Sequence, residues 1–194
     1  MARTNAKYFS YKKNLLAAGS APTPVKVLVA NSTTLKIGQA ARVNTSGLAV
    51  PAGVGNPVLG IVSGIVDNYD VPVNSAFYGG ATGHSNSGDD TVTTASDNTT
   101  RALAVYAEIL VGTEPVLFYN DANGDLAQTN LLQFFDLAST SDQIDQATAS
   151  DANGQFQLMQ LDPDNDGDLS KGLFRVNESQ LNGGVDSATA KVVA

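Results

Sequence analysis

The sequence predicts an all-β protein: an antiparallel sandwich or barrel with an extended N-terminal arm and long polar loops. Three observations predict this class. Several short segments alternate apolar and polar residues with a period of two. Turn-forming residues separate these segments, and three Asn-Gly pairs are typical of hairpin turns. No amphipathic pattern reaches about 12 residues, which argues against repeated βαβ units.

The first segment, residues 1–24, is predicted to be an arm. Tyr8, Tyr11 and Leu15 lie at helical spacing, but an isolated helix this short is marginal in water. Two prolines then end any regular structure. We therefore expect an extended arm that becomes ordered only on a partner.

Residues 25–194 are predicted to form one β-domain. The clearest strand is 103–111, in which apolar side chains alternate around Glu108. Residues 58–66 form a nearly continuous apolar run, which predicts a buried strand. The two glycines of this run indicate bulges or the close approach of another backbone. The other expected strands are 25–29, 35–37, 115–119, 132–137, 155–161 and 173–177.

Two stretches of small and polar residues, 79–101 and 138–154, are predicted to be long surface loops. Loops of this length in a compact domain commonly take part in binding. Tyr69, Phe77 and Tyr78 form a loose aromatic group before the first loop, and packing in a core or in an interface explains them equally well.

Positive charge is concentrated at the start of a chain whose net charge is -8. Residues 1–66 contain seven basic residues and no acid, whereas 67–194 contain all 19 acids and four basic residues. A basic arm that docks on an acidic or polar partner explains this asymmetry, and so does a short solvated tail. Nucleic acid is not expected as a partner, because the acidic body would repel phosphate. No apolar run is long enough to predict a membrane span.

The side chains on which most catalytic sites depend are scarce, so we expect that the protein is not an enzyme. There is no cysteine, and the single histidine, His84, lies in the first polar loop. A nucleophile normally needs a neighbouring base, and transition-metal sites normally need His or Cys. A pair of carboxylates remains a minor alternative because acids are plentiful. No catalytic residue is assigned.

The sharpest local motif is the acidic stretch 162–170, DPDNDGDLS. Carboxylates at alternate positions before a glycine turn supply the clustered oxygens that Ca²⁺ prefers, and the first seven positions match an EF-hand loop. The twelfth position, where that loop has Glu, is Leu173, and no helix is predicted on either side. A solvated acidic turn between two strands is the alternative. The candidate Ca²⁺ ligands are Asp162, Asp164, Asp166 and Asp168.

Two segments carry a resemblance to a known family. Residues 37–52, IGQAARVNTSGLAVPA, and 57–66, PVLGIVSGIV, resemble the strand–turn–strand and apolar strand of tailed-bacteriophage capsid decoration (cement) proteins. Residues 155–181 are similar to C-terminal segments of phage virion proteins. The resemblance covers about half of the chain, in composition and strand order rather than in an invariant motif.

The resemblance implies a structural virion protein on the capsid exterior, which stabilises the shell by bridging subunits of the major capsid protein. It also implies a homo-oligomer, a trimer or a dimer, because symmetric assembly repeats one contact many times. The alternative is a Ca²⁺-dependent adhesion or carbohydrate-binding β-module that uses the acidic stretch. The residues expected to contact the capsid through the arm are Arg3, Lys7, Tyr8, Phe9, Tyr11, Lys12 and Lys13.

Overall fold

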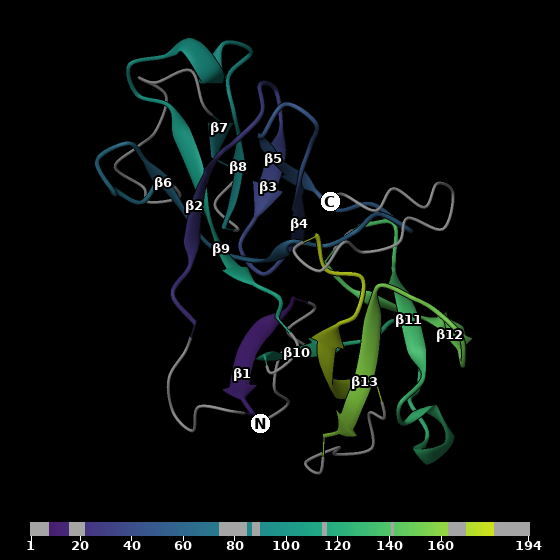
Figure 1. Ribbon diagram of the computed structural model, residues 1–194. Coiled ribbons are helices and arrows are strands. Elements are labelled where there is room, and N and C mark those ends of the chain that lie inside the picture. The colour runs from purple at the N-terminus through teal and green to yellow at the C-terminus, as the bar shows by residue number, and fades with distance from the viewer. Residues whose placement is uncertain are drawn as a thin grey trace.

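A computed structural model describes residues 8–15, 22–73, 85–86, 90–113, 116–140, 142–162 and 170–180. It confirms the all-β class: antiparallel sheets pack as a sandwich (Figure 1). Among these residues no helix is long and apolar enough to cross a membrane. The elements are β1 (Ser10–Asn14), β2 (Val25–Leu28), β3 (Thr34–Lys36), β4 (Ala40–Val43), β5 (Ala49–Pro51), β6 (Gly60–Asp67), β7 (Ser85–Asn86), β8 (Thr91–Thr93), β9 (Val105–Val111), β10 (Val116–Asp121), β11 (Phe134–Leu137), β12 (Ile144–Ser150), β13 (Phe156–Leu161) and β14 (Lys171–Val176), with short 3-10 turns η2 (Asn98–Thr100) and η3 (Gln128–Asn130).

Strands β2 to β9 form one lobe, here called the N-lobe. Its larger sheet has the order β2-β9-β6-β4-β5, and its smaller sheet has the order β3-β8-β7. The larger sheet closes on itself, because Val29 after β2 bridges Ala49 of β5, and the Ala30 amide donates to the Ala49 carbonyl at 3.1 Å. Leu35 of β3 and Val92 of β8 complete the buried interior. The N-lobe is therefore a small barrel capped by a second sheet.

The two longest strands of the N-lobe follow the predicted patterns. In β9 alternate residues such as Ala107 and Ile109 are buried, as expected from the period of two. The register of β6 against β9 shifts just before Gly64, which is the predicted bulge. A side chain at Gly60 would overlap the Leu110 carbonyl, which is the predicted close backbone approach. Glycine is thus required here by packing against β9.

The second lobe, the C-lobe, is a six-stranded sheet in the order β1-β10-β14-β13-β11-β12. It curls so that β12 returns to the end of β10, where the Asn120 side chain accepts a hydrogen bond from the Ile144 amide at 2.9 Å. Aromatic side chains fill the inside of the curl, and the rings of Phe135 and Phe174 meet edge to face at 5.9 Å. The fully buried aromatic residues are Phe118, Phe135, Phe156 and Phe174.

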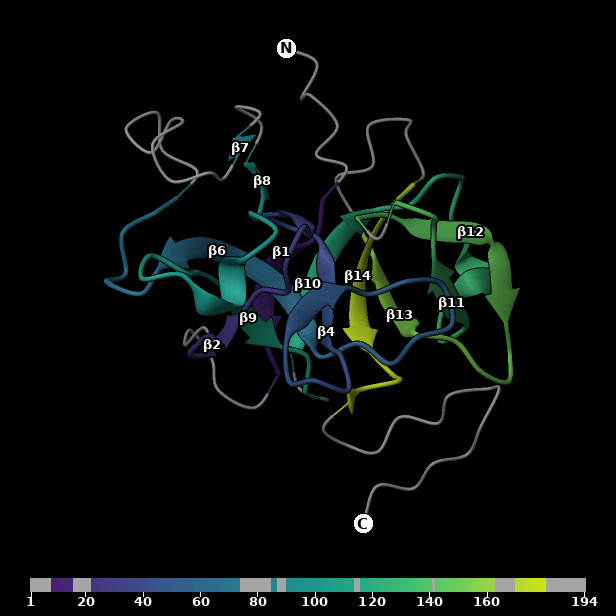
Figure 2. The same cartoon turned by 90° about the horizontal axis from the view of Figure 1, so that it is seen from above.

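The two lobes lie side by side and share one apolar core (Figures 1 and 2). Residues of the N-lobe such as Ala40 and Ile61 belong to the same buried cluster as the C-lobe aromatics. Polar contacts reinforce the junction: the buried side chain of Gln155 donates to the carbonyls of Gly53 and Asn56 at 2.9 and 2.6 Å. The lobes are therefore packed together as one folded unit.

The N-terminal segment differs from the expected arm. Residues 10–14 form β1, which pairs antiparallel with β10 inside the six-stranded sheet. Phe9 is buried and stacks on Phe156, with ring centroids 4.8 Å apart. Its amide donates to the Gly38 carbonyl of the N-lobe at 2.9 Å. Residues 9–14 are held by contacts within the chain, so the prediction that they become ordered only on a partner is wrong.

The predicted loop 138–154 is also corrected. Residues 144–150 form strand β12, which pairs with β11. Sequence patterns missed this strand because it is polar, with Ile144 as its only fully buried residue. Side chains of neighbouring loops complete its hydrogen bonds, as when the side-chain Oδ1 of Asn123 accepts from the Gln146 backbone amide at 2.8 Å.

The predicted loop 79–101 is structured where the structure describes it. Residues 85–86 and 91–93 are strands, and residues 98–100 form a 3-10 turn. Two of its polar side chains are buried, Thr94 and Asn98. The side-chain Nδ2 of Asn98 donates to the Val29 carbonyl at 2.7 Å, so this stretch contributes to the stability of the barrel.

Candidate functional site

The aromatic residues predicted to contact a capsid lie within the fold. The Tyr8 ring lies against Lys36, whose Nζ is 3.8 Å from the ring centroid and donates to the Tyr8 hydroxyl. Phe9 is 3% exposed and belongs to the shared core. Tyr11 is half-buried and packs against the same core. These three side chains pack against the rest of the fold, Phe9 buried and Tyr8 and Tyr11 half-buried.

The basic residues of the same segment have a different environment. Lys12 and Lys13 are exposed on β1, at the edge of the six-stranded sheet. Lys13 donates to the Gln160 side chain at 3.1 Å. Arg3 and Lys7 lie outside the described residues. Of the described residues predicted to contact the capsid, Lys12 and Lys13 are those that are exposed.

Of the four candidate Ca²⁺ ligands in the acidic stretch, Asp162 is described. Asp162 follows β13, and its amide donates to the Lys171 carbonyl at 3.0 Å. Asp164, Asp166 and Asp168 lie outside the described residues. Within the described part, no three acidic or histidine side chains converge on a point that could hold a metal ion. The Ca²⁺ site stays a prediction.

A buried carboxylate lies beside this stretch. Asp121 is the last residue of β10 and is 3% exposed. It lies opposite Lys171 in the register of β10 against β14. The Ser170 hydroxyl donates to its carboxylate. This hydrogen bond joins the last residue of β10 to the residue just before β14.

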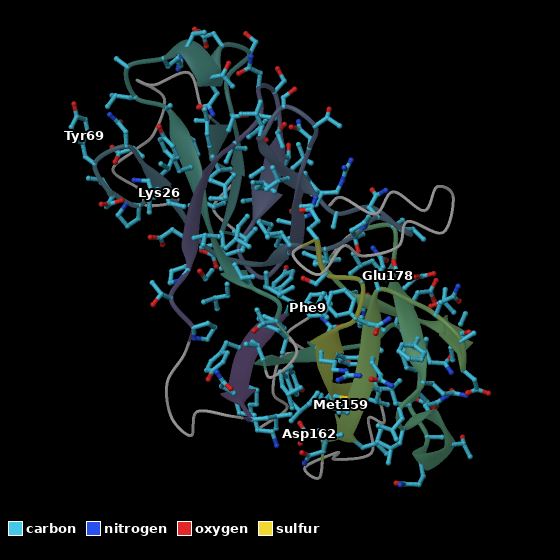
Figure 3. All side chains as sticks on the ribbon, viewed as in Figure 1. Phe9, Lys26, Tyr69, Met159, Asp162 and Glu178 are labelled. Atoms are coloured by element: carbon cyan, nitrogen blue, oxygen red, sulfur yellow. The ribbon has the colours of Figure 1, made fainter. Side chains whose placement is uncertain are left out.

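The most exposed large apolar side chain of the described residues was not predicted as a site residue. Tyr69, at the tip of the hairpin after β6, is 71% exposed and points away from the N-lobe (Figure 3). Val71 of the same hairpin is 44% exposed. Leu103 is 38% exposed and belongs to the same end of the barrel, because Val105 two residues later pairs with Asp67. We call Tyr69, Val71 and Leu103 the apolar tip.

Hydrogen bonds fix the hairpin that carries the apolar tip. The buried Asp67 carboxylate accepts hydrogen bonds from the amides of Tyr69 and Val71 at 2.8 and 2.9 Å. Asp70 has φ +64, a left-handed conformation that Asp tolerates in tight turns. Its carboxylate is 2.5 Å from Lys26 Nζ, so the turn is also tied to β2. The exposed tyrosine is therefore presented on a rigid turn.

A sequence signal for this site does exist. Tyr69 stands in the polar turn segment DNYD, where an aromatic side chain has no strand to pack against. The loose aromatic group had two equal explanations, core or interface. For Tyr69, exposure decides against the core.

The comparisons with known proteins add no relative. No family model matches the chain, no curated protein matches it, and no solved structure matches it.

Proposed function

We propose that the protein is a structural virion protein that binds the outer surface of a phage capsid and stabilises it by bridging major capsid protein subunits. The observation that carries the proposal is the apolar tip: an exposed tyrosine and two aliphatic side chains on a rigid turn. Tyr is enriched among the residues that dominate binding energy at interfaces, because it buries a large area and loses little side-chain entropy.

The sequence resemblance supports the same proposal. The residues that resemble decoration proteins form β4, β5 and β6, three adjacent strands of the N-lobe barrel. The apolar tip directly follows β6, so it is presented by the segment that carries the resemblance. A rigid barrel that projects a small apolar surface suits a protein that works by covering area on a shell.

Binding to shells tests the proposal directly. Assembled shells of the cognate major capsid protein are mixed with the purified chain and sedimented, and the copies bound per shell are counted. The native chain is expected to bind at a fixed ratio, and Tyr69→Ala to weaken binding by about 30-fold, the effect of losing one interface anchor of roughly 2 kcal/mol.

Leu132→Ala is the matched control, because Leu132 is also apolar and 60% exposed but lies in the C-lobe. It is expected to bind like the native chain. Equal binding of the Tyr69 and Leu132 variants would remove the apolar tip from the contact, and no binding by the native chain would reject the function.

The N-terminal contacts need a separate test. Deletion of residues 1–20 is unsuitable, because it removes Phe9 and β1 from the fold. Arg3→Ala combined with Lys7→Ala leaves both in place. We expect this double variant to bind shells more weakly at low salt than the native chain, since charge contacts are screened as salt rises.

A further inference from the structure

The two outer strands of the six-stranded sheet carry opposite charge. At one edge is β1 with Lys12 and Lys13, called here the basic edge. At the other edge the β11–β12 hairpin carries Asp136, Asp142 and Asp145, called the acidic edge. Figures 1 and 2 both place β1 and β12 on opposite sides of the C-lobe.

The acidic edge holds like charges together without a cation. Asp136 and Asp145 are directly opposite each other on β11 and β12, an arrangement that disfavours strand pairing. All three carboxylates are half-buried. Residues 102–170 contain no Lys, Arg or His, so this part of the chain cannot neutralise them. Among the described residues the ion pairs are Lys26–Asp70 and Arg101–Asp97, both in the N-lobe.

Neutral donors orient these carboxylates. The Asn123 side chain donates to Asp145 at 3.0 Å, and the Gln155 amide donates to Asp136 at 3.3 Å. No group of three metal-ligating side chains is found in the described ranges. The acidic edge is thus a fixed concentration of negative charge that makes no ion pair with a described basic residue of the same chain, and it favours a cationic side chain from a second molecule.

The basic edge has the complementary properties. Lys12 and Lys13 are exposed and make no ion pair with a described carboxylate. A β-bulge between Tyr11 and Lys13 interrupts the strand. Bulges and lysines on an edge strand hinder pairing with another strand. A contact at this edge is therefore made by the lysine side chains and not by extension of the sheet.

We propose that copies of this protein associate head to tail, the basic edge of one copy against the acidic edge of the next. The contact is heterologous, because two different surfaces meet, so each copy keeps one free edge for another copy. The second copy is the partner that the charges specify, since one chain carries both complementary edges. Self-association does not depend on shell binding and can be measured without shells.

Exchange of the charges provides the test. Sedimentation velocity is measured on the purified full chain at about 0.1 M and about 1 M salt, between which the Debye length falls from roughly 10 to 3 Å. The native chain is expected to form complexes larger than a monomer at low salt and to dissociate at high salt. The basic-edge variant is Lys12→Glu with Lys13→Glu, and the acidic-edge variant is Asp142→Lys with Asp145→Lys.

Each reversed variant alone is expected to associate at least about 100-fold more weakly, because like charges then face each other. An equimolar mixture of the two variants is expected to regain the complexes, because its reversed edges are complementary again. If the Asp145 change disturbs β12, Asp142→Lys alone serves, since the side chain of Asp142 makes no described hydrogen bond.

Thr45→Glu with Ser46→Glu, on an exposed turn of the N-lobe, is the control for added negative charge, and we expect it to associate like the native chain. A native chain that stays monomeric at low salt overturns the proposal. So does a mixture that fails to associate, or a control that associates as weakly as the basic-edge variant.

Discussion

Replacing Phe9 with alanine tests whether the N-terminal segment is part of the fold. Phe9 is 3% exposed, and its ring stacks on Phe156 at 4.8 Å in the core shared by the two lobes. A Phe→Ala change in such a core costs about 3–5 kcal/mol, the sum of the lost transfer free energy and the cavity that remains. For a chain of this size that loss lowers the melting temperature by about 6–20 °C.

Urea denaturation of the purified chain, followed by far-ultraviolet circular dichroism, measures the effect. With a slope of roughly 2 kcal/mol per molar urea, the midpoint is expected to fall by about 1.5–2.5 M. Lys12→Ala is the control on the neighbouring strand, because Lys12 is exposed, and it is expected to change stability by less than about 0.5 kcal/mol.

The competing view is a detachable arm that becomes ordered only on a partner. An arm of that kind contributes nothing to the free chain, so Phe9→Ala would leave the midpoint unchanged. Equal midpoints for Phe9→Ala and Lys12→Ala would refute the assignment of Phe9 to the core.

Three further outcomes are expected. Gly38→Ala should lose about 2–3 kcal/mol of stability, because φ is +81 and a Cβ would lie 2.6 Å from the Cβ of Tyr8. Gly47→Ala is the control: φ is +77 but the space around it is open, so it should lose only about 1 kcal/mol. Similar losses for the two variants would contradict the close contact at Gly38. Asn98→Ala should cost about 3 kcal/mol in thermal unfolding, because it removes the side chain that bonds the buried Val29 carbonyl and Val105 amide. An unchanged melting temperature would reject that role. Saturating Ca²⁺, at about 100 times its dissociation constant, should stabilise the chain by about 2.7 kcal/mol, and Asp164→Asn with Asp166→Asn should abolish the gain. A melting temperature insensitive to both Ca²⁺ and chelator would remove the metal site.

The glycines of the Asn-Gly pairs are required for a reason other than the one predicted from the sequence. The Asn-Gly pairs were expected to supply positive φ values in hairpins. Gly124 and Gly154 are not among the residues with positive φ. A side chain at Gly154 would instead lie 2.7 Å from the Phe135 amide nitrogen, so glycine is needed there for close packing against β11. The sequence pattern indicates a glycine-dependent position, but the neighbour that requires glycine comes from another part of the chain.

The candidate site was only partly predictable for a similar reason. Residue type singled out the N-terminal aromatics as contact residues, but a tyrosine or phenylalanine serves a core as well as an interface. Burial separates the two uses: Phe9 is 3% exposed and Tyr69 is 71% exposed. Lys12 and Lys13 could be predicted to be exposed, because burying an unpaired ammonium group is costly.

The sequence by itself determined the all-β class and most of the strands, because a strand with one buried face has apolar residues at every second position. It also determined the bulge and the close backbone approach in β6, since glycine within an apolar strand is itself the sequence signal for both. Only the tertiary structure decided that residues 10–14 and 144–150 are strands, because both are polar edge strands without an apolar period of two. The first pairs with the distant β10, and the second with the preceding strand β11. It alone brought the basic and acidic edges to opposite sides of one sheet, since strand order depends on long-range pairing that no local pattern specifies.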